Sequence, residues 1–290
     1  MTVTVNLWHS NGMATGERVN RSNGLSGPSE SQDRKAGRAI EAFHFAFLEV
    51  GLTELRSAEF ALKGGGNLRL FLRSKRRSRD LDLDFLGKDF ERFGDRVDAI
   101  FRSRTLTTLL QTRELRLVDP RRSKDTSRVK RWKLFLAAPD MEDAPTKIEF
   151  SARGTDALPV IELCDEVLAH RLQARAVLVN HYPAVHAIEQ KVGALAERSE
   201  TQPRDVFDLD HLFREYPSAF QEAKLAPGVI RQVLDRVREL SYADYQNLVV
   251  DYLEEEVELV YGTQAAWEGI QRSVSSQLEA RLKELEERTA

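Results

Sequence analysis

The alternating stretch DLDLDF, residues 80–85, limits the fold of this chain more than any other feature. Successive side chains of a β-strand point to opposite faces of its sheet. The stretch therefore predicts a strand with one apolar face toward a core. Its other face carries three carboxylates: Asp80, Asp82 and Asp84. Three like charges on one face destabilise a strand unless something offsets them.

A divalent cation is one way to offset these charges. Mg²⁺ prefers carboxylate oxygens and typically binds one or two of them together with substrate phosphates. Glu149, in the strand-like run TKIEF, is a candidate third ligand if its strand lies next to residues 80–85. The alternative is an ordinary polar face turned to solvent, which is common in sheets. The aspartates alone do not choose between these two interpretations.

Three consecutive glycines, Gly64 to Gly66, lie between a predicted strand at residues 58–63 and a predicted short helix at residues 67–74. Glycine lets the backbone approach a bulky anion, and a helix N-terminus attracts negative charge. Such a loop beside a metal-binding strand suits phosphoryl chemistry. Most glycine triplets are only turns, however, and this spacing fits neither a Walker loop nor a dinucleotide-binding fingerprint.

The order of predicted elements indicates an α+β fold with two domains. Residues 1–33 are rich in Ser, Gly and Asn, which predicts a flexible N-terminal tail. Residues 34–158 mix helical and strand patterns, which predicts a mixed sheet. Residues 159–290 are mostly helical in pattern, and we expect single helices at residues 164–179, 184–198, 203–216 and 242–260. The transition between the domains is expected near residue 158.

Two further local predictions concern the N-terminal domain. The pattern of residues 33–51 predicts an amphipathic helix that begins at Asp33 and ends at Gly51. The runs VKRWKLFLA and TKIEFSAR, separated by APDMEDAP, predict a β-hairpin.

Composition excludes several classes of protein. The single cysteine, Cys164, cannot form a disulfide within the chain, which fits a reducing cytoplasm. No apolar run approaches about 18 residues, so no transmembrane helix or membrane partner is expected. The six histidines show no metal-ligand spacing, which argues against zinc. The net charge is −3, so any binding of nucleic acid depends on local basic runs at residues 73–79 and 121–133.

These motifs together resemble the AbiEii/AbiGii toxin family, which belongs to the polymerase beta-like nucleotidyltransferase superfamily and includes MenT-like toxins. The first matching motif combines LKGGGNLRLF with RRSRDLDLDF, and the second is IEQKVGALAERSETQPRDVFDLDHL, residues 188–212. The match covers about residues 35–215. The resemblance implies a nucleotidyltransferase-fold domain with a mixed sheet, followed by an α-helical domain that completes the active site.

The resemblance also implies roles for individual residues. Asp80, Asp82 and Glu149 would bind Mg²⁺, or Mn²⁺ in its place, and Lys191 and Asp208 would join them as catalytic residues. The substrate would be a nucleoside triphosphate (NTP). Its binding residues would be Lys63, Gly64, Gly65, Gly66, Lys191, Arg204 and Asp205.

Three positions stand apart from the family pattern. Gly66 replaces a small hydroxyl residue, and Asn67 replaces a small apolar residue. Asp84 lies outside the paired-acid motif, so the resemblance assigns it no role.

The resemblance implies a Mg²⁺-dependent toxin of a type IV toxin–antitoxin system. It would transfer a nucleoside monophosphate to an acceptor hydroxyl, such as the 3′ end of tRNA, and arrest growth. A cognate antitoxin encoded nearby would oppose it. Two alternatives stay open: an enzyme of the same fold that modifies protein side chains, and a non-catalytic module that binds nucleotide or a protein partner.

Overall fold

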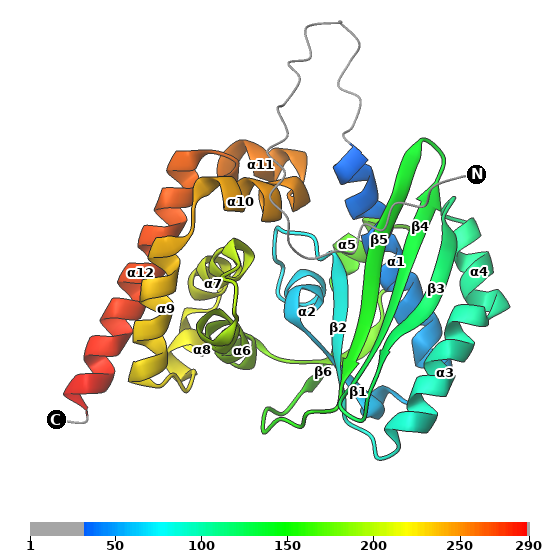
Figure 1. Cartoon of the computed structure of the whole chain (residues 1–290), viewed down its shortest axis with the longest axis horizontal. Helices are drawn as coiled ribbons and strands as arrows, with labels where there is room; N and C mark the ends of the chain where they lie inside the picture. The colour runs from blue at the N-terminus through cyan, green and yellow to red at the C-terminus, as the bar shows by residue number, and fades with distance from the viewer. Residues whose placement is uncertain (1–31, 289–290) are drawn as a thin grey trace, which may run out of the picture. The chain divides into compact units, whose positions relative to one another are not determined.

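A computed structural model describes residues 32–288, and a seven-stranded mixed sheet organises the first part of it (Figure 1). The strand order is β3-β4-β5-β2-β1-β7-β6. The strands are β1 (Phe60–Lys63), β2 (Asp80–Phe85), β3 (Arg116–Asp125), β4 (Val129–Ala138), β5 (Met141–Ser151), β6 (Val160–Leu163) and β7 (Leu178–His181). Because β2 pairs antiparallel with β1 and parallel with β5, the acidic strand lies inside the sheet and not at its edge.

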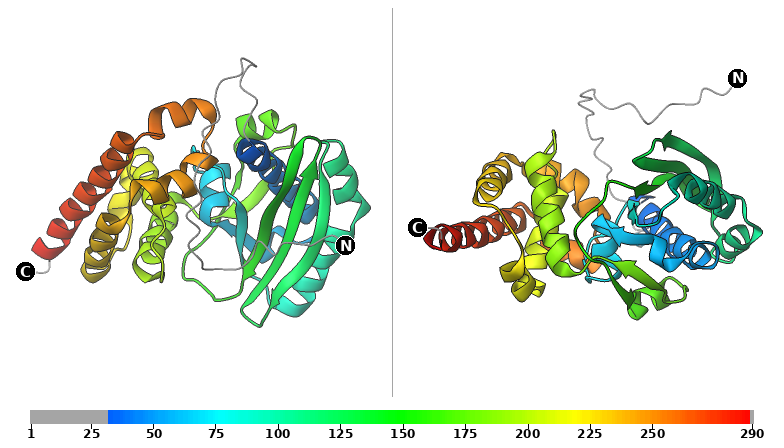
Figure 2. Two further views of the ribbon diagram at one scale, coloured as in Figure 1. Left: turned by 45° about the horizontal axis from the view of Figure 1, so that its top comes forward. Right: turned by 90° about the horizontal axis from the view of Figure 1, so that it is seen from below.

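One face of the sheet packs on helices and forms the first core. These helices are α1 (Gln32–Glu54), α3 (Phe90–Arg102) and α4 (Arg104–Gln111). Figure 2 shows α3 and α4 beside this face of the strands. Leu81 and Leu83 of β2 and Phe150 of β5 are fully buried here. Burial of such a side chain contributes roughly 1.5–3 kcal/mol, which explains why the apolar face of DLDLDF points this way.

The second core is helical. Its helices are α6 (Ala184–Glu197), α7 (Pro203–Glu215), α8 (Pro217–Glu222), α9 (Pro227–Glu239), α10 (Tyr242–Leu248), α11 (Glu255–Tyr261) and α12 (Gln264–Glu287). The short helix α2 (Gly64–Leu70) contacts both β2 and α6. Its Leu70 belongs to the first core, whereas its Leu68 belongs to the second. The glycine triplet is the first turn of this helix, so the predicted loop before a helix at residues 67–74 is wrong. The glycine-rich helix connects the two cores.

The α+β class is confirmed, as are several local elements. The strand at residues 80–85 forms as predicted, and so does a β4–β5 hairpin, but most of the predicted loop at residues 138–145 is strand, which leaves a short turn between Ala138 and Met141. Helices α6 and α7 coincide with the two halves of the second motif. The predicted tail, residues 1–33, lies outside the described residues apart from Gln32 and Asp33, which are in α1.

The prediction of one helix at residues 164–179 is wrong. This segment contains the short helix α5 (Glu166–Arg171) and then enters β7, which pairs with β1 on one side and β6 on the other. A short apolar run such as AVLV suits a buried strand as well as a helix, and periodicity cannot separate the two. The sheet thus continues to His181, beyond the expected transition near residue 158. The division into domains at 34–158 and 159–290 stays a prediction.

Two helix boundaries also differ from the prediction. Helix α1 continues through Gly51 to Glu54, since a single glycine is tolerated inside a helix. The predicted helix at residues 242–260 is interrupted between α10 and α11 by a 3₁₀ turn at Val250–Tyr252. There Leu253 is buried and forms a β-bridge with Arg76, which helical backbone would not permit. No helix within residues 32–288 is long and apolar enough to cross a membrane.

Candidate active site

The polar face of β2 places its carboxylates beside those of β5. In the parallel pairing, Asp82 lies opposite Glu149 and Asp80 lies opposite Lys147. Neighbouring strands are about 4.8 Å apart, so Asp82 and Glu149 are adjacent side chains on one face. The sequence made Glu149 a candidate ligand only if its strand lies next to residues 80–85. The sheet has this arrangement.

Two of these acids are held by cations. Lys147 Nζ lies 3.1 Å from Asp80 Oδ2, and Arg131 Nε donates to Glu149 Oε2 at 2.5 Å. Asp82 forms no ion pair with any residue of the described chain. These contacts offset the like charges of the acidic face. They also leave Asp82 as the acid that a ligand can reach without displacing a protein cation.

The residues present fit a hard cation by donor chemistry, because three carboxylates lie on two adjacent strands. Within residues 32–288, however, no three His, Cys, Asp or Glu side chains already converge as a metal site. Here Asp80 and Glu149 each form an ion pair with a protein cation. A cation bound by all three acids would take the place of Lys147 and Arg131.

The glycine triplet approaches Asp82 closely. Gly64 has φ +65°, a left-handed conformation that favours glycine, and a Cβ there would lie 3.2 Å from Asp82 Oδ2. A Cβ at Gly65 would come within 2.7 Å of Ser78 Oγ. A side chain at Gly64 would crowd Asp82, and one at Gly65 would collide with Ser78.

Gly66 and Asn67 face away from this space. A Cβ at Gly66 would lie 3.0 Å from Leu81 Cδ1, so this glycine serves the packing of α2 on β2. Asn67 is fully buried, donates to the Tyr182 carbonyl at 2.7 Å and lies 2.9 Å from His181 Nδ1. The departure from the family pattern at Asn67 thus joins α2 to the end of β7.

Asp84 is held by two neighbours. Lys63 forms an ion pair with it, and the Tyr182 hydroxyl donates to Asp84 Oδ2 at 2.9 Å. Burial, and then the charge of Asp84, raises the pKa of the Tyr182 phenol, so this hydroxyl stays protonated and donates. Asp84 therefore connects β1, β2 and the residue after β7, and it also lines the larger of the two cavities described below.

A buried ion network holds Lys191. Its Nζ lies 2.8 Å from Asp205 Oδ1 and 2.6 Å from Asp208 Oδ2. Arg76 donates twice to Asp208, at 2.9 and 3.2 Å. Burial alone would raise the pKa of Asp208, but the charges of Arg76 and Lys191 lower it well below its usual value. Because Asp208 is fully buried, it lies behind Lys191 and contacts no space open to a substrate.

Two adjoining cavities, of about 230 and 920 Å³, open over these residues. Both are lined by residues from the sheet, the glycine triplet and α6: Gly64, Asp82, Glu149, Lys191 and Arg198. The smaller also contains Asp80, Gly65 and Arg204, and the larger contains Lys63 and Asp205. Of the predicted site residues, Gly66 and Asp208 line neither cavity.

The family follows from comparison with known proteins. The model described as "Nucleotidyl transferase AbiEii toxin, Type IV TA system" matches residues 52–287, which include both motifs. The chain belongs to the AbiEii family of nucleotidyltransferase toxins. The type IV description of this AbiEii family implies an antitoxin as a partner. A comparison with curated proteins finds no match.

Solved structures share the AbiEii-family fold at low sequence identity. JHP933 from Helicobacter pylori has a TM-score of 0.51 and 20% identity, over 88% of this chain and 98% of that one. A putative nucleotidyltransferase from H. pylori has a TM-score of 0.53 and 21% identity, over 90% and 98%. MenT4, nucleotidyltransferase toxin Rv2826c from Mycobacterium tuberculosis H37Rv, has a TM-score of 0.52 and 14% identity, over 85% of each chain.

Sequence reasoning missed several residues of the candidate site. Arg131 and Lys147 neutralise acids, Arg76 braces Asp208, and Arg198 Nη1 lies 3.2 Å from Asp205 Oδ2. The alternation of β5 already places Lys147 on the face of Glu149, so that residue had a local signal. The others depend on contacts between distant segments.

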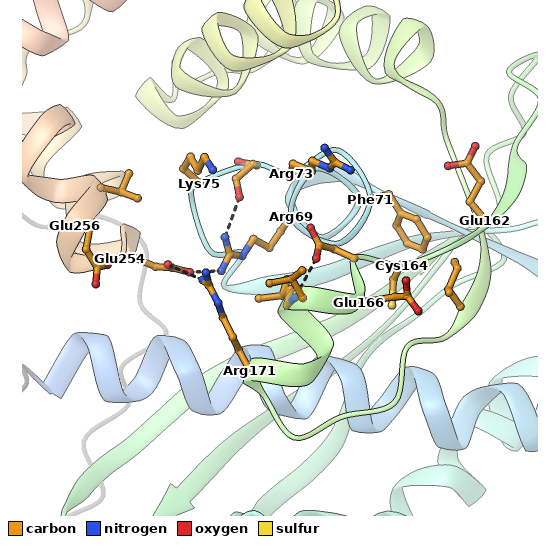
Figure 3. A pocket seen from close by; sticks show the side chains of 16 residues that line it. Arg69, Phe71, Arg73, Lys75, Glu162, Cys164, Glu166, Arg171, Glu254 and Glu256 are labelled. Carbon is orange, nitrogen blue, oxygen red and sulfur yellow. Dashed lines mark hydrogen bonds and ion pairs between the residues drawn. The ribbon is translucent and has the colours of Figure 1, made fainter.

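Another cavity, of about 1120 Å³, lies near the end of α2 and is drawn in Figure 3. Its lining includes Arg69, which pairs with Glu41 and Glu254, and Arg171, whose Nη1 lies 3.3 Å from Glu254 Oε2. None of the predicted site residues lines it. For this reason we do not place the active site there.

Proposed function

We propose that this chain is a Mg²⁺-dependent nucleotidyltransferase that transfers a nucleoside monophosphate from an NTP to an RNA hydroxyl. The leading candidate acceptor is the 3′ end of tRNA, and the consequence would be growth arrest. One observation carries the proposal: Asp82, Glu149, Gly64 and Lys191 line the same adjoining cavities. Nucleotidyl transfer requires acids to bind a metal, backbone that phosphates can approach, and a cation to neutralise phosphate charge. These residues supply all three in one space.

Asp80, Asp82 and Glu149 would hold the metal, Mg²⁺ or Mn²⁺. When bound, it would activate the acceptor oxygen and stabilise charge on the phosphates. The acceptor oxygen would form a bond to the α-phosphorus as the bond to the β-phosphate bridging oxygen breaks, and pyrophosphate would leave. Asp82, which has no ion-pair partner in the described chain, is the candidate acceptor of the hydroxyl proton.

Lys191 would contact the NTP phosphates. Asp205 and Asp208 fix its position, and their burial keeps both carboxylates from turning toward solvent. Gly64 and Gly65 would let the phosphates approach β2, and Arg204 would add positive charge at the smaller cavity. Asp208 would act as a positioning residue, because it forms ion pairs with Lys191 and Arg76 and does not line either cavity.

The test is incubation of the purified chain with each α-labelled NTP, MgCl₂ and total tRNA. We expect label on RNA, a loss of at least about 100-fold in Asp82→Asn, and wild-type activity in Asp143→Asn. Asp143 is an exposed carboxylate on the same strand as Glu149 and serves as the control. Transfer that survives Asp82→Asn would refute the site. Label on protein but not on RNA would support the protein-modifying alternative.

Cytoplasmic action and the identity of the antitoxin are also proposals. Co-expression with each neighbouring gene, scored by growth, tests the antitoxin. A non-catalytic module would give neither labelled product nor any difference in growth between the wild type and Asp82→Asn.

A further inference from the structure

The sheet face that bears the acids continues across β5, β4 and β3 as a row of cations. Cross-strand partners share a face, so the pairings trace two lines outward from β2. One line is Asp82, Glu149, Arg131 and Lys124, and the other is Asp80, Lys147, Lys133 and Arg121. We call the cations of these two lines the basic face: Arg121, Lys124, Arg131, Lys133 and Lys147.

Side chains of the basic face are partly exposed within the described residues. The side chain of Arg121 is 55% exposed, and that of Arg131 is 31% exposed. Helices α1 and α4 pack on these strands from the other side, where Trp132 and Ile148 are buried. Within residues 32–288, the helices that pack on these three strands therefore leave the basic face available.

Positive charge is concentrated here although the whole chain carries −3. Burial lowers the pKa of the Lys133 ammonium, and the neighbouring charges of Arg131, Arg121 and Lys147 lower it further. A polyanion would relieve this repulsion. If Asp80 and Glu149 take up a metal, Lys147 and Arg131 also lose their carboxylate partners and become available to phosphates.

An apolar patch borders the basic face. Phe135 pairs with Pro145 on β5 and with Val118 on β3, one step along the same face. Phe135 is partly exposed, unlike its strand neighbours Leu134 and Leu136, which are buried. An aromatic ring beside a line of cations is the arrangement on which unpaired bases stack while their phosphates are neutralised.

We propose that the basic face and Phe135 bind the final nucleotides of a single-stranded RNA and deliver its 3′ hydroxyl to Asp80 and Asp82. This inference rests on the proposed transfer to RNA and specifies where the acceptor lies. From β2 to β3 there are three strand spacings, about 14 Å, or roughly four nucleotides of a stacked strand.

Binding is measured without NTP, by fluorescence anisotropy of a 5′-labelled single-stranded oligoribonucleotide. The test variant is Arg121→Gln/Lys133→Gln. The control is Arg272→Gln/Lys283→Gln, which removes two exposed charges from α12. We expect about tenfold weaker binding in the test variant, with the slope of log affinity against log salt reduced by about 1.4. The control should bind within twofold of the wild type.

The ring of Phe135 is tested separately. Phe135→Leu should weaken binding of the single strand by about fivefold or more, and Phe135→Tyr should retain it, because only the latter keeps a stacking surface. Thermal unfolding of each variant shows whether a loss of binding reflects a loss of fold.

The inference is overturned if the Arg121→Gln/Lys133→Gln variant binds as the wild type does, or if blunt duplex RNA binds as tightly as the single strand. These outcomes are distinct from failure of the proposed function. The proposed function fails if Asp82→Asn still transfers nucleotide or if the wild type transfers none. The binding assay contains no NTP, so its result does not depend on transfer. Affinity for a fluorescent NTP should be unchanged in Arg121→Gln/Lys133→Gln.

Discussion

Asp82 and Asp208 are both aspartates close to Lys191, but their surroundings differ. Asp208 is fully buried and bonded to Lys191 and Arg76, whereas Asp82 is partly exposed and has no ion pair within the described chain. The sequence motif treats both as catalytic. Their environments separate a residue that supports the fold from one that can meet a substrate.

Substitution should expose this difference. Asp208→Asn leaves two buried cations without a full partner, so we expect a loss of about 3–5 kcal/mol in the free energy of unfolding. Asp82→Asn should change it by less than about 1 kcal/mol. Urea unfolding followed by circular dichroism measures both. Similar stabilities for the two variants would contradict the roles assigned here.

His44 supplies a pH dependence. It is fully buried in α1, and burial lowers its pKa to about 3. Since the folded pKa lies below the unfolded value of about 6.5, protonation favours unfolding, and stability is lost as pH falls below about 6.5. The expected loss from this group between pH 7.5 and pH 5 is about 2 kcal/mol.

The measurement for His44 is the free energy of unfolding at both pH values in the wild type and in His44→Gln. The variant is less stable at neutral pH but should lack this part of the pH dependence. If the free energy of unfolding changes by the same amount between pH 7.5 and pH 5 in His44→Gln as in the wild type, His44 does not take up a proton on unfolding.

At the scale of elements, Lys147 and Arg131 form ion pairs with the acids of β2 and β5 that are proposed to bind the metal. Lys147→Gln removes the partner of Asp80 and restores repulsion between the acids. We expect a lower melting temperature in EDTA and a larger rise on adding MgCl₂ than in the wild type. Differential scanning fluorimetry measures both, with the exposed Lys88→Gln as control. An equal Mg²⁺ effect in wild type and variant would count against metal binding by these acids.

The junction between β1 and α2 gives a second prediction at this scale. Gly64→Ala forces φ +65° on a residue with a Cβ and crowds Asp82, so we expect a loss of about 1–2 kcal/mol in stability and a marked loss of transfer. Gly269→Ala in α12, where a Cβ meets nothing within 4 Å, should instead stabilise by up to about 1 kcal/mol. Chemical unfolding and the transfer assay are measured for both variants. A loss in Gly64→Ala but not in Gly269→Ala shows that the effect comes from strain at Gly64 and not from removing a glycine in general.

For the whole molecule, α2 joins the sheet core to the helical core through Leu70 and Leu68. Shared packing predicts one cooperative unfolding transition. Trp132 reports on the sheet core and Trp267 on the helical core. Their urea midpoints should coincide when each is studied as the single tryptophan of the chain. Separate midpoints would instead support two independent domains divided near residue 158.

Much of the site's local geometry was accessible from sequence. The period of two in residues 80–85 placed the aspartates on one face, and the period of 3.6 predicted α6 and α7. These patterns succeed because burial of one face of a strand or helix depends on near neighbours in the chain.

By itself, then, the sequence determined the acidic strand and the helices that carry Lys191 and Asp208, but it placed the glycines of α2 in a loop. Only the tertiary structure decided that Glu149 lies beside Asp82, that Arg131 and Lys147 hold the acids, and that β6 and β7 extend the sheet. The physical reason is that strand pairing and buried ion pairs join residues far apart in the chain. Their energies depend on the packing of the whole molecule and leave no periodic trace in any one segment.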